Sequence, residues 1–153
     1  MNAAACELCA APGGTVLWRD ALLRVIAVDE PDYPGFLRVV WNAHVREMSD
    51  LAPADAAHLL RAVLAAEAAV RAVLAPDKIN LASLGNQVPH LHWHVIGRFR
   101  DDAHFPQPIW GTRQRAADAT ALAHRRALAL QLGTALGRAL ATAEPSSPPG
   151  GKG

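Results

Sequence analysis

Three histidines alternate with apolar residues in the segment HLHWHVI, where they are His90, His92 and His94. In an extended strand, side chains two positions apart point to the same face and lie roughly 6.6–7 Å apart. The three imidazoles would therefore share one face of a strand, and the apolar residues between them would form the opposite, buried face. Because histidine titrates near neutral pH and can act as base, nucleophile, hydrogen-bond donor to phosphate or metal ligand, this pattern predicts a site of chemistry.

Two other interpretations of the histidine segment stay open. The strand could simply expose three polar residues that happen to be histidine. Alternatively, an H-x-H pair with a third ligand suits a catalytic zinc site, which keeps one position open for water. All three histidines of one straight strand would span too far for a single tetrahedral ion, so this interpretation needs two adjacent members and a ligand from elsewhere.

Cys6 and Cys9 are the two cysteines of the chain and form a C-x-x-C pair. In a reducing compartment, such a pair favours a metal or redox role over a structural disulfide. A redox role is less favoured, because no strand-to-helix pattern follows the pair. The remaining alternative is two buried or idle thiols near the amino terminus.

Composition places limits on the function. The chain has 153 residues, of which 51% are hydrophobic and 19% charged, as expected for one globular domain with a substantial core. The formal net charge is +1 and the pI about 7.9, so no overall field attracts a nucleic acid polymer or an anionic membrane. No apolar run approaches the roughly 18–20 residues that span a bilayer, and the amino terminus lacks a signal-peptide pattern. We therefore expect a cytoplasmic protein with no membrane partner.

The elements that must position these residues form a small α+β domain. β-branched and aromatic runs bounded by turn residues predict strands at 15–18, 22–28, 36–41, 79–84 and 91–99. Helical periods predict a helix over 53–74, opened by a proline, and a second amphipathic helix over about 115–143, broken by Gly133 and Gly137. Hairpin-length links between strands predict an antiparallel sheet of about five strands with two main helices.

The histidine segment matches the His-φ-His-φ-His-φ-φ signature of the histidine triad (HIT) nucleotide hydrolases and transferases, in which φ is apolar. Upstream, Gly35–His44 is similar to the family's Gly-His-x-x-Val-x-Pro-Lys-x-His strand, and Asn80 precedes the triad by about the usual distance. The resemblance covers roughly residues 6–111 of a single domain predicted over 1–144. The low-complexity segment 145–153 predicts a disordered tail.

This resemblance implies a HIT-like fold, a homodimer whose sheet continues across the interface, and a nucleotide substrate. The reaction would be hydrolysis or nucleotidyl transfer at the α-phosphate of a dinucleoside polyphosphate, a nucleoside phosphoramidate or a related adenylate. His92 would attack phosphorus and form a nucleotidyl-imidazole that water then resolves. His94 would face the same phosphate and either donate to a non-bridging oxygen or protonate the leaving group.

The resemblance also implies contacts to the substrate. Asn80 and Gln87 would supply amide contacts to the phosphate or orient the histidines, and Asp29 would accept hydrogen bonds from ribose hydroxyls. The loop after Asp29 is about one residue short relative to the family pattern, so Glu30 or Asp32 could substitute for it. As an alternative, Asn80, Gln87 and Asp29 are loop or turn residues with only local hydrogen bonds.

For the cysteine pair, the resemblance to HIT members that carry one implies a structural zinc ion. Its ligands would be Cys6, Cys9, His44 and His90. A Cys₂His₂ tetrahedron is closed, so the ion would join the amino terminus to the sheet without acting as a Lewis acid. The first triad histidine would then serve the structure, while the other two serve the chemistry.

Phe36 and Trp41 depart from the family pattern, because many members have histidine and proline at these positions. The altered pocket favours a second hypothesis, a nucleotide-binding regulatory module that keeps the pocket without useful turnover. A third hypothesis is a metal-dependent hydrolase that uses the triad itself. Trp110, in a proline-rich loop, could stack on a base, close the dimer or pack in the core.

Overall fold

The computed structural model describes residues 5–143, so the predicted tail at 145–153 lies outside the described residues. In chain order the helices and strands are α1 (Glu7–Ala10), β1 (Thr15–Arg19), β2 (Leu23–Ala27), β3 (Leu37–Trp41), the 3-10 helix η2 (Met48–Asp50), α2 (Pro53–Leu74), β4 (Lys78–Ala82), β5 (His92–Arg98), α3 (Ala119–Ala129) and α4 (Leu132–Ala143). Each predicted strand is present, with its ends shifted by no more than two residues.

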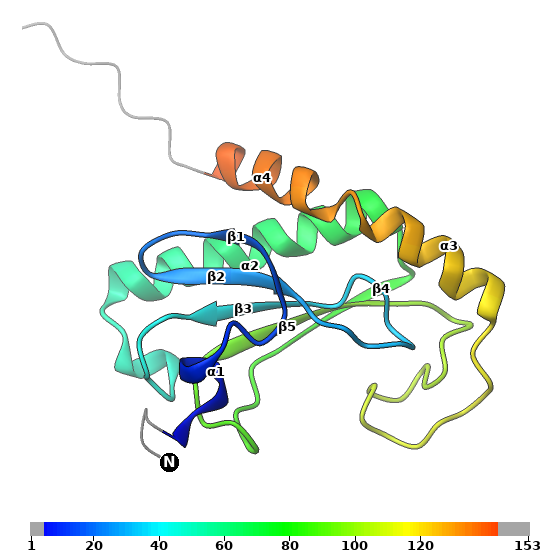
Figure 1. The fold of residues 1–153 in the computed structure, drawn as a ribbon, viewed down its shortest axis with the longest axis horizontal. Helices are drawn as coiled ribbons and strands as arrows, with labels where there is room; N and C mark the ends of the chain where they lie inside the picture. Colours follow the sequence, from blue (N-terminus) through cyan, green and yellow to red (C-terminus); the bar gives the residue numbers. More distant parts are fainter. Residues whose placement is uncertain (1–4, 144–153) are drawn as a thin grey trace, which may run out of the picture.

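The five strands form one antiparallel sheet in the order β1-β2-β3-β5-β4. In Figure 1, α2 runs behind this sheet and the short α1 lies in front of it, while α3 and α4 follow one another along the upper side. The α+β class and the five-stranded antiparallel sheet are therefore confirmed. None of the helices in residues 5–143 is both long and apolar enough to cross a membrane.

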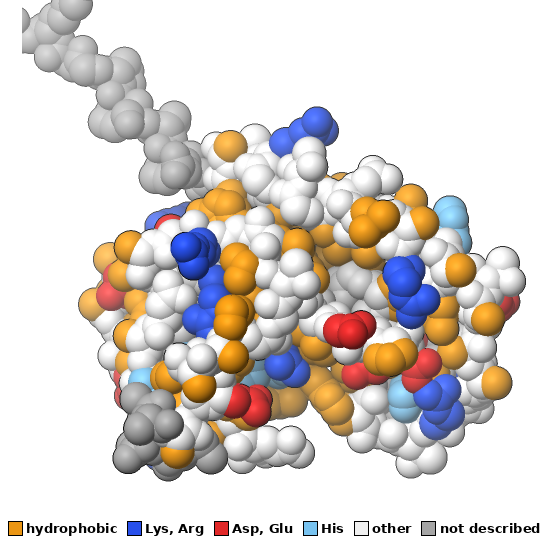
Figure 2. All heavy atoms as spheres, viewed as in Figure 1, with side chains coloured by type: hydrophobic (Ala, Val, Ile, Leu, Met, Phe, Trp, Pro, Cys, Tyr) orange, Lys and Arg blue, Asp and Glu red, His pale blue; other side chains and the backbone are white. Residues whose placement is uncertain are grey.

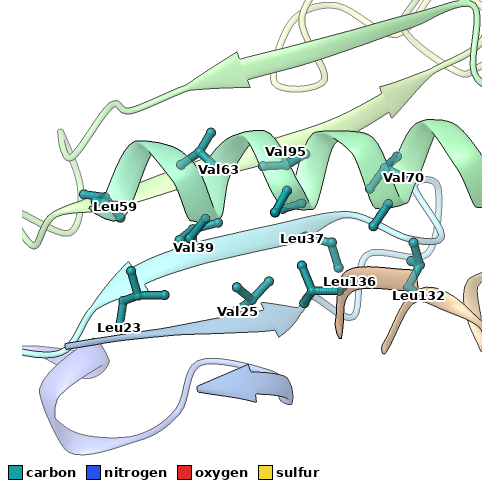
Figure 3. Packing of buried hydrophobic residues seen from close by; sticks show 14 of the residues in the cluster. Leu23, Val25, Leu37, Val39, Leu59, Val63, Val70, Val95, Leu132 and Leu136 are labelled. Atoms are coloured by element: carbon teal, nitrogen blue, oxygen red, sulfur yellow. The ribbon is translucent and has the colours of Figure 1, made fainter. Parts of the chain in front are cut away.

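Helix α2 has the predicted bounds because its sequence marks both ends. It begins with Pro53, and proline is suited to the first helical turn because N–H groups there have no partner within the helix. It ends before Ala75, which adopts a left-handed conformation with φ 46°. Its buried side chains, among them Leu59 and Val63, pack against sheet residues such as Val39 (Figure 3). Full burial of an aliphatic side chain contributes about 1.5–3 kcal/mol relative to exposure. This core fixes the central strands.

The carboxyl-terminal segment differs from the prediction of one helix over 115–143. It forms α3 and α4, separated at Leu130 and Gln131, and the two glycines expected to break it lie inside α4. α4 packs on α2 and β1, whereas α3 is held by Arg125, which pairs with both carboxylate oxygens of Asp101 at 2.7 and 2.9 Å. Helix α3 also contacts α2, and the chain bends between the two helices at Leu130, which is 86% exposed.

The pairing of β3 with β5 decides which side chains meet at the site. Arg38 lies opposite His94, and Val40 lies opposite His92. Because side chains alternate along a strand, these residues share the face turned away from α2, while Val39 packs in the core beneath α2. The sheet therefore offers one face for packing and the other for chemistry.

Candidate functional site

His92 and His94 line a cavity of about 340 Å³ on the sheet face turned away from α2. α1 contributes to one wall, the segment before β5 to another, and Trp110 from the loop after β5 to a third. Figure 2 views this hollowed face, with histidine and basic side chains visible inside the hollow. The lining residues are Glu7, Leu8, Arg38, Leu84, Gly85, Asn86, Gln87, Val88, His92, His94 and Trp110.

The imidazole of His92 is fixed in one tautomer. Its Nδ1 lies 2.6 Å from the backbone carbonyl oxygen of His90. A carbonyl oxygen only accepts, so Nδ1 carries the proton and Nε2 keeps the lone pair. Burial lowers the pKa of His92, the hydrogen bond to His90 opposes this shift, and the charge of Arg38 adds to it. His92 is therefore a neutral imidazole at pH 7, the form required of a nucleophile.

The ring of His94 lies beside that of His92, with 4.7 Å between ring centroids. Trp110 and Phe36 contact His94 at centroid distances of 5.0 and 5.6 Å. Burial, followed by the charges of His92 and Arg38, lowers the pKa of His94 to about 3, so this ring is also neutral at pH 7. Its Nδ1 is buried and has no hydrogen-bond partner within residues 5–143.

His90 differs from the other two triad members, because it precedes β5 and its ring contacts the cysteine pair. Its Nε2 lies 2.6 Å from the carbonyl oxygen of Trp41, so Nε2 donates and Nδ1 keeps the lone pair. Nδ1 in turn lies 3.4 Å from Sγ of Cys6 and 3.5 Å from Sγ of Cys9. A histidine whose second nitrogen is held by a carbonyl is typical of a metal ligand.

Cys6, Cys9, His44 and His90 form a cluster whose four donor atoms all lie within 4.8 Å of one another. Nδ1 of His44 lies 3.3 Å from Sγ of Cys9. Two sulfur and two imidazole donors suit a tetrahedral ion such as zinc, and four protein donors leave no open position. The cluster could therefore hold a metal. In the described part of the chain no other group of this kind is present, so His90 is the one triad member in such an arrangement.

Asn80 lies on β4, and its side chain forms a hydrogen bond with the side chain of Arg98. Its Oδ1 accepts a hydrogen bond of 2.8 Å from Nη1 of Arg98. Arg98 is 2% exposed and donates from Nε to Asp102, which is 3% exposed, at 2.8 Å. Asn80 does not line the cavity of the histidines. Both predicted roles of Asn80, an amide contact to the phosphate and orientation of the histidines, stay predictions.

Asp102 connects this network to the loop that carries Trp110. Burial opposes ionisation of its carboxyl group, but hydrogen bonds from Arg98 and from the backbone N–H groups of His104, Phe99 and Phe105 outweigh burial and lower the pKa of Asp102 to about 2. A lowered pKa means that the carboxylate stabilises the fold above its unfolded pKa of about 3.9. This stabilisation is lost as the pH falls through about 2.

Replacing Asp102 with asparagine at pH 7 is expected to lower the free energy of unfolding by about 3–5 kcal/mol, because the buried charge of Arg98 loses its counter-charge. Urea denaturation measures the change. Asp101→Asn is the matched control, since Asp101 is the neighbouring residue but its side chain is 52% exposed in its pair with Arg125, and it is expected to cost less than about 1 kcal/mol. Equal losses in the two variants would contradict the role assigned to Asp102.

The remaining sequence-predicted contacts fall in different places. Gln87 lines the cavity with the histidines. Asp29 is exposed in the loop after β2 and does not line the cavity. Of its two possible substitutes, Asp32 pairs with Arg113, and Glu30 takes part in the backbone turns of the loop. Gln87 thus shares the cavity with the histidines, whereas the acidic residues of this loop are not among the residues that line it.

Arg38 lines the cavity although the sequence analysis did not select it. A signal was present, because Phe36, Arg38 and Val40 alternate onto one face of a strand that is otherwise apolar. The register that sets Arg38 directly opposite His94 depends on pairing between distant segments. Spacing within one strand does not reveal it.

A larger hollow, of about 640 Å³, is lined by residues of α2, α4 and the β1–β2 hairpin. Its polar groups are occupied with one another and with the backbone. Nε2 of His58 lies 2.6 Å from Oδ2 of Asp20, whose Oδ1 accepts from the backbone N–H groups of Leu22 and Leu23. We place the candidate site in the smaller cavity, because that cavity contains His92, whose Nε2 has a lone pair available for reaction. The volume of a cavity alone does not indicate chemistry.

Known proteins resemble this chain in sequence. Residues 13–101 match the HIT domain family, a range that contains β1 to β5 and the three histidines. Two curated relatives, each an AP-4-A phosphorylase of Mycobacterium tuberculosis, are 30% identical over 106 residues, which make up 65% of this chain and 54% of theirs. This chain thus spans about half the length of the curated relatives that it matches.

Solved structures share the fold. A histidine triad protein from Bradyrhizobium japonicum is 30% identical with a TM-score of 0.65, over 84% of this chain and 92% of that one. A second, from Marinobacter aquaeolei VT8, is 27% identical with a TM-score of 0.66, over 85% and 95%. A zinc-bound histidine triad family protein from Mycobacterium smegmatis is 22% identical with a TM-score of 0.62, over 94% and 100%. At that identity, the likeness is one of fold alone.

Proposed function

This chain belongs to the HIT domain family, and from that membership we propose that it hydrolyses or transfers a nucleotidyl group at the α-phosphate of a dinucleoside polyphosphate, a nucleoside phosphoramidate or a related adenylate. The observation that carries the proposal is the fixed tautomer of His92, whose Nε2 keeps its lone pair in a cavity large enough for part of a nucleotide. The AP-4-A phosphorylases of M. tuberculosis, related over about two thirds of this chain, support a nucleotide substrate.

The proposed reaction proceeds in two displacements. Nε2 of His92 attacks the α-phosphorus, so that a phosphorus–nitrogen bond forms while the bond to the leaving group breaks and its electron pair departs with that group. Water, or another acceptor such as orthophosphate, then attacks the nucleotidyl-imidazole and releases His92 with its lone pair restored. The carbonyl oxygen of His90 accepts from Nδ1 throughout, and it stabilises the positive charge that develops on the imidazole.

His94 is proposed to hold the same phosphate. With a pKa of about 3, it has no imidazolium proton to give at pH 7 in the free protein. Its role is then a hydrogen bond from its N–H to a non-bridging oxygen, where negative charge increases during the attack. Trp110 covers one side of His94, and Gln87 is available for an amide contact to the phosphate.

For the cluster of Cys6, Cys9, His44 and His90, the proposed ion is zinc, which when bound supplies a tetrahedral cross-link. The four residues come from the segments at α1, after β3 and before β5, so the cross-link would hold the amino terminus on the sheet. It would also immobilise His90, whose carbonyl oxygen orients the nucleophile. The ligand set thus supports the chemistry through position, not through an open coordination site.

A turnover assay tests the proposed function against its alternatives. The full chain is incubated with diadenosine tetraphosphate, with and without orthophosphate, and the products are separated by chromatography. Hydrolysis is expected to release AMP, and phosphorolysis ADP. Binding of AMP without any product would instead identify a regulatory module, which the departure at Phe36 favours. Loss of turnover at once on chelation, before any loss of fold, would identify a metal-dependent hydrolase.

Family membership also supports a homodimer, for which the outer edge of β4 is available. β4 is at one end of the sheet and exposes Leu81 at 37%, and Leu64 on α2 is 59% exposed. An exposed strand edge with apolar side chains is a surface for association. Light scattering at micromolar concentration is expected to give the mass of two chains, and the mass of one chain would reject the dimer. A cytoplasmic location stays a prediction.

A further inference from the structure

Arg38 brings a positive charge into the cavity of the histidines, where Glu7 also lies but forms no ion pair with it. Its side chain lines the cavity, yet its Nε is buried and has no hydrogen-bond partner among residues 5–143. The salt bridges of the described chain do not include it, and its Cζ lies 5.5 Å from the centroid of the Phe36 ring. Burial lowers the pKa of Arg38 and Glu7 opposes the shift, but an arginine keeps its proton in either case.

A second buried atom of the same cavity lacks a partner. Nδ1 of His94 and Nε of Arg38 are the two unpaired buried side-chain polar atoms in the described part of the chain. Their residues face each other directly across β3 and β5, where side chains on one face begin about 4.5–5.5 Å apart. Because native proteins leave few buried polar atoms unpaired, two on one cross-strand pair point to a shared ligand. A ligand that pairs with a guanidinium accepts hydrogen bonds and carries negative charge.

The chemistry at His92 requires such a charge partner. A neutral imidazole that attacks an anionic phosphate gains from a cation that reduces the negative charge on the phosphate oxygens. Arg38 is the one lysine or arginine among the described residues that line the cavity. Its planar guanidinium presents paired donors that match phosphate oxygens, as a lysine ammonium does not.

We propose that Arg38 binds non-bridging oxygens of the phosphate on which His92 acts, together with His94. This assignment rests on the proposed function and deepens it, since it makes Arg38 a catalytic residue that selects substrates with an ionised phosphate at the reacting position. An uncharged phosphate ester or a nucleoside without phosphate would not engage it.

Calorimetric titration of the full chain with adenosine, AMP and ADP tests the assignment. In Arg38→Gln, the affinity for AMP is expected to fall by about 10- to 100-fold, the range of a hydrogen bond to a charged group, while the affinity for adenosine stays within about twofold. Arg38→Lys keeps the charge but loses the paired donors, so an intermediate loss is expected. Arg138→Gln removes a charge of the same sign from an exposed position of α4, and all three affinities should stay unchanged.

Two results would overturn the assignment. Equal losses for adenosine and AMP would mean that Arg38 shapes the pocket and does not bind phosphate. A loss confined to ADP would place Arg38 at a second phosphate, away from His94. Thermal melting confirms that each variant is folded, and Arg38→Lys carries the test if Arg38→Gln does not fold.

The binding measurement separates this inference from the proposed function, because it needs no turnover. A protein that binds AMP through Arg38 but yields no product would reject the hydrolase and leave the assignment intact. A protein that turns over its substrate, and whose Arg38→Gln variant binds AMP as tightly as the wild type, would reject the assignment alone.

Discussion

Replacing His92 with asparagine is expected to lower kcat for nucleotide substrates by about 10³–10⁶-fold while AMP binding is retained. Asparagine keeps a polar amide near the carbonyl oxygen of His90 but has no nitrogen lone pair that can attack phosphorus. In other hydrolases with a covalent intermediate, removal of the nucleophile lowers kcat by a factor of about this size, because the catalytic groups act together. Steady-state kinetics measure the loss, and calorimetry measures the binding that should remain.

His124→Asn is the matched control for this substitution. His124 is an exposed histidine on α3 that does not line the cavity, so kcat should be unchanged. Turnover at the wild-type rate in His92→Asn would reject covalent catalysis through His92. Thermal melting of both variants shows whether the fold is kept.

Replacing His44, one of the four residues of the metal cluster, is expected to lower the stability of the protein strongly. The purified protein should contain one zinc ion per chain. In His44→Ala the zinc content should fall, and the free energy of unfolding should drop by at least about 3 kcal/mol, which for a domain of this size lowers Tm by about 10 °C. His44 is only half-buried, so its truncation alone removes little packing and the loss reports the ion. Elemental analysis and thermal melting measure the two quantities.

His124→Ala provides the control for the metal prediction, with no expected change in zinc content or Tm. A chelator should reproduce the loss of Tm in the wild type and add little in His44→Ala. Purified protein that contains no zinc, with Cys6 and Cys9 freely alkylated in the native state, would contradict the structural zinc ion.

The sequence was most informative where local rules decide the structure. The bounds of α2 follow from Pro53 and from the stop after Leu74, and alternation placed the strands to within two residues. The break between α3 and α4 was not predicted correctly, because it depends on where each half docks. Gly133 and Gly137 are tolerated inside α4, while the chain bends at Leu130.

The candidate site shows the same division between local and distant effects. The spacing of the triad indicated three equivalent imidazoles, but their tautomers depend on the carbonyl groups of His90 and Trp41, which only the fold brings near. The binding of Asn80 to Arg98 also depends on pairing between β4 and β5. The register of Arg38 with His94 likewise has no sequence signal. The metal cluster, whose members come from three separate segments, was foreseen through family resemblance and not through spacing.

The stereochemical course at phosphorus tests the covalent role of His92 most directly. A substrate made chiral at the α-phosphorus with sulfur and oxygen isotopes is turned over by the wild-type protein, and the configuration of the product is determined. Two in-line displacements, the first by His92 and the second by water or orthophosphate, predict net retention of configuration. Inversion, the result of one direct displacement, would contradict catalysis through a nucleotidyl-His92 intermediate.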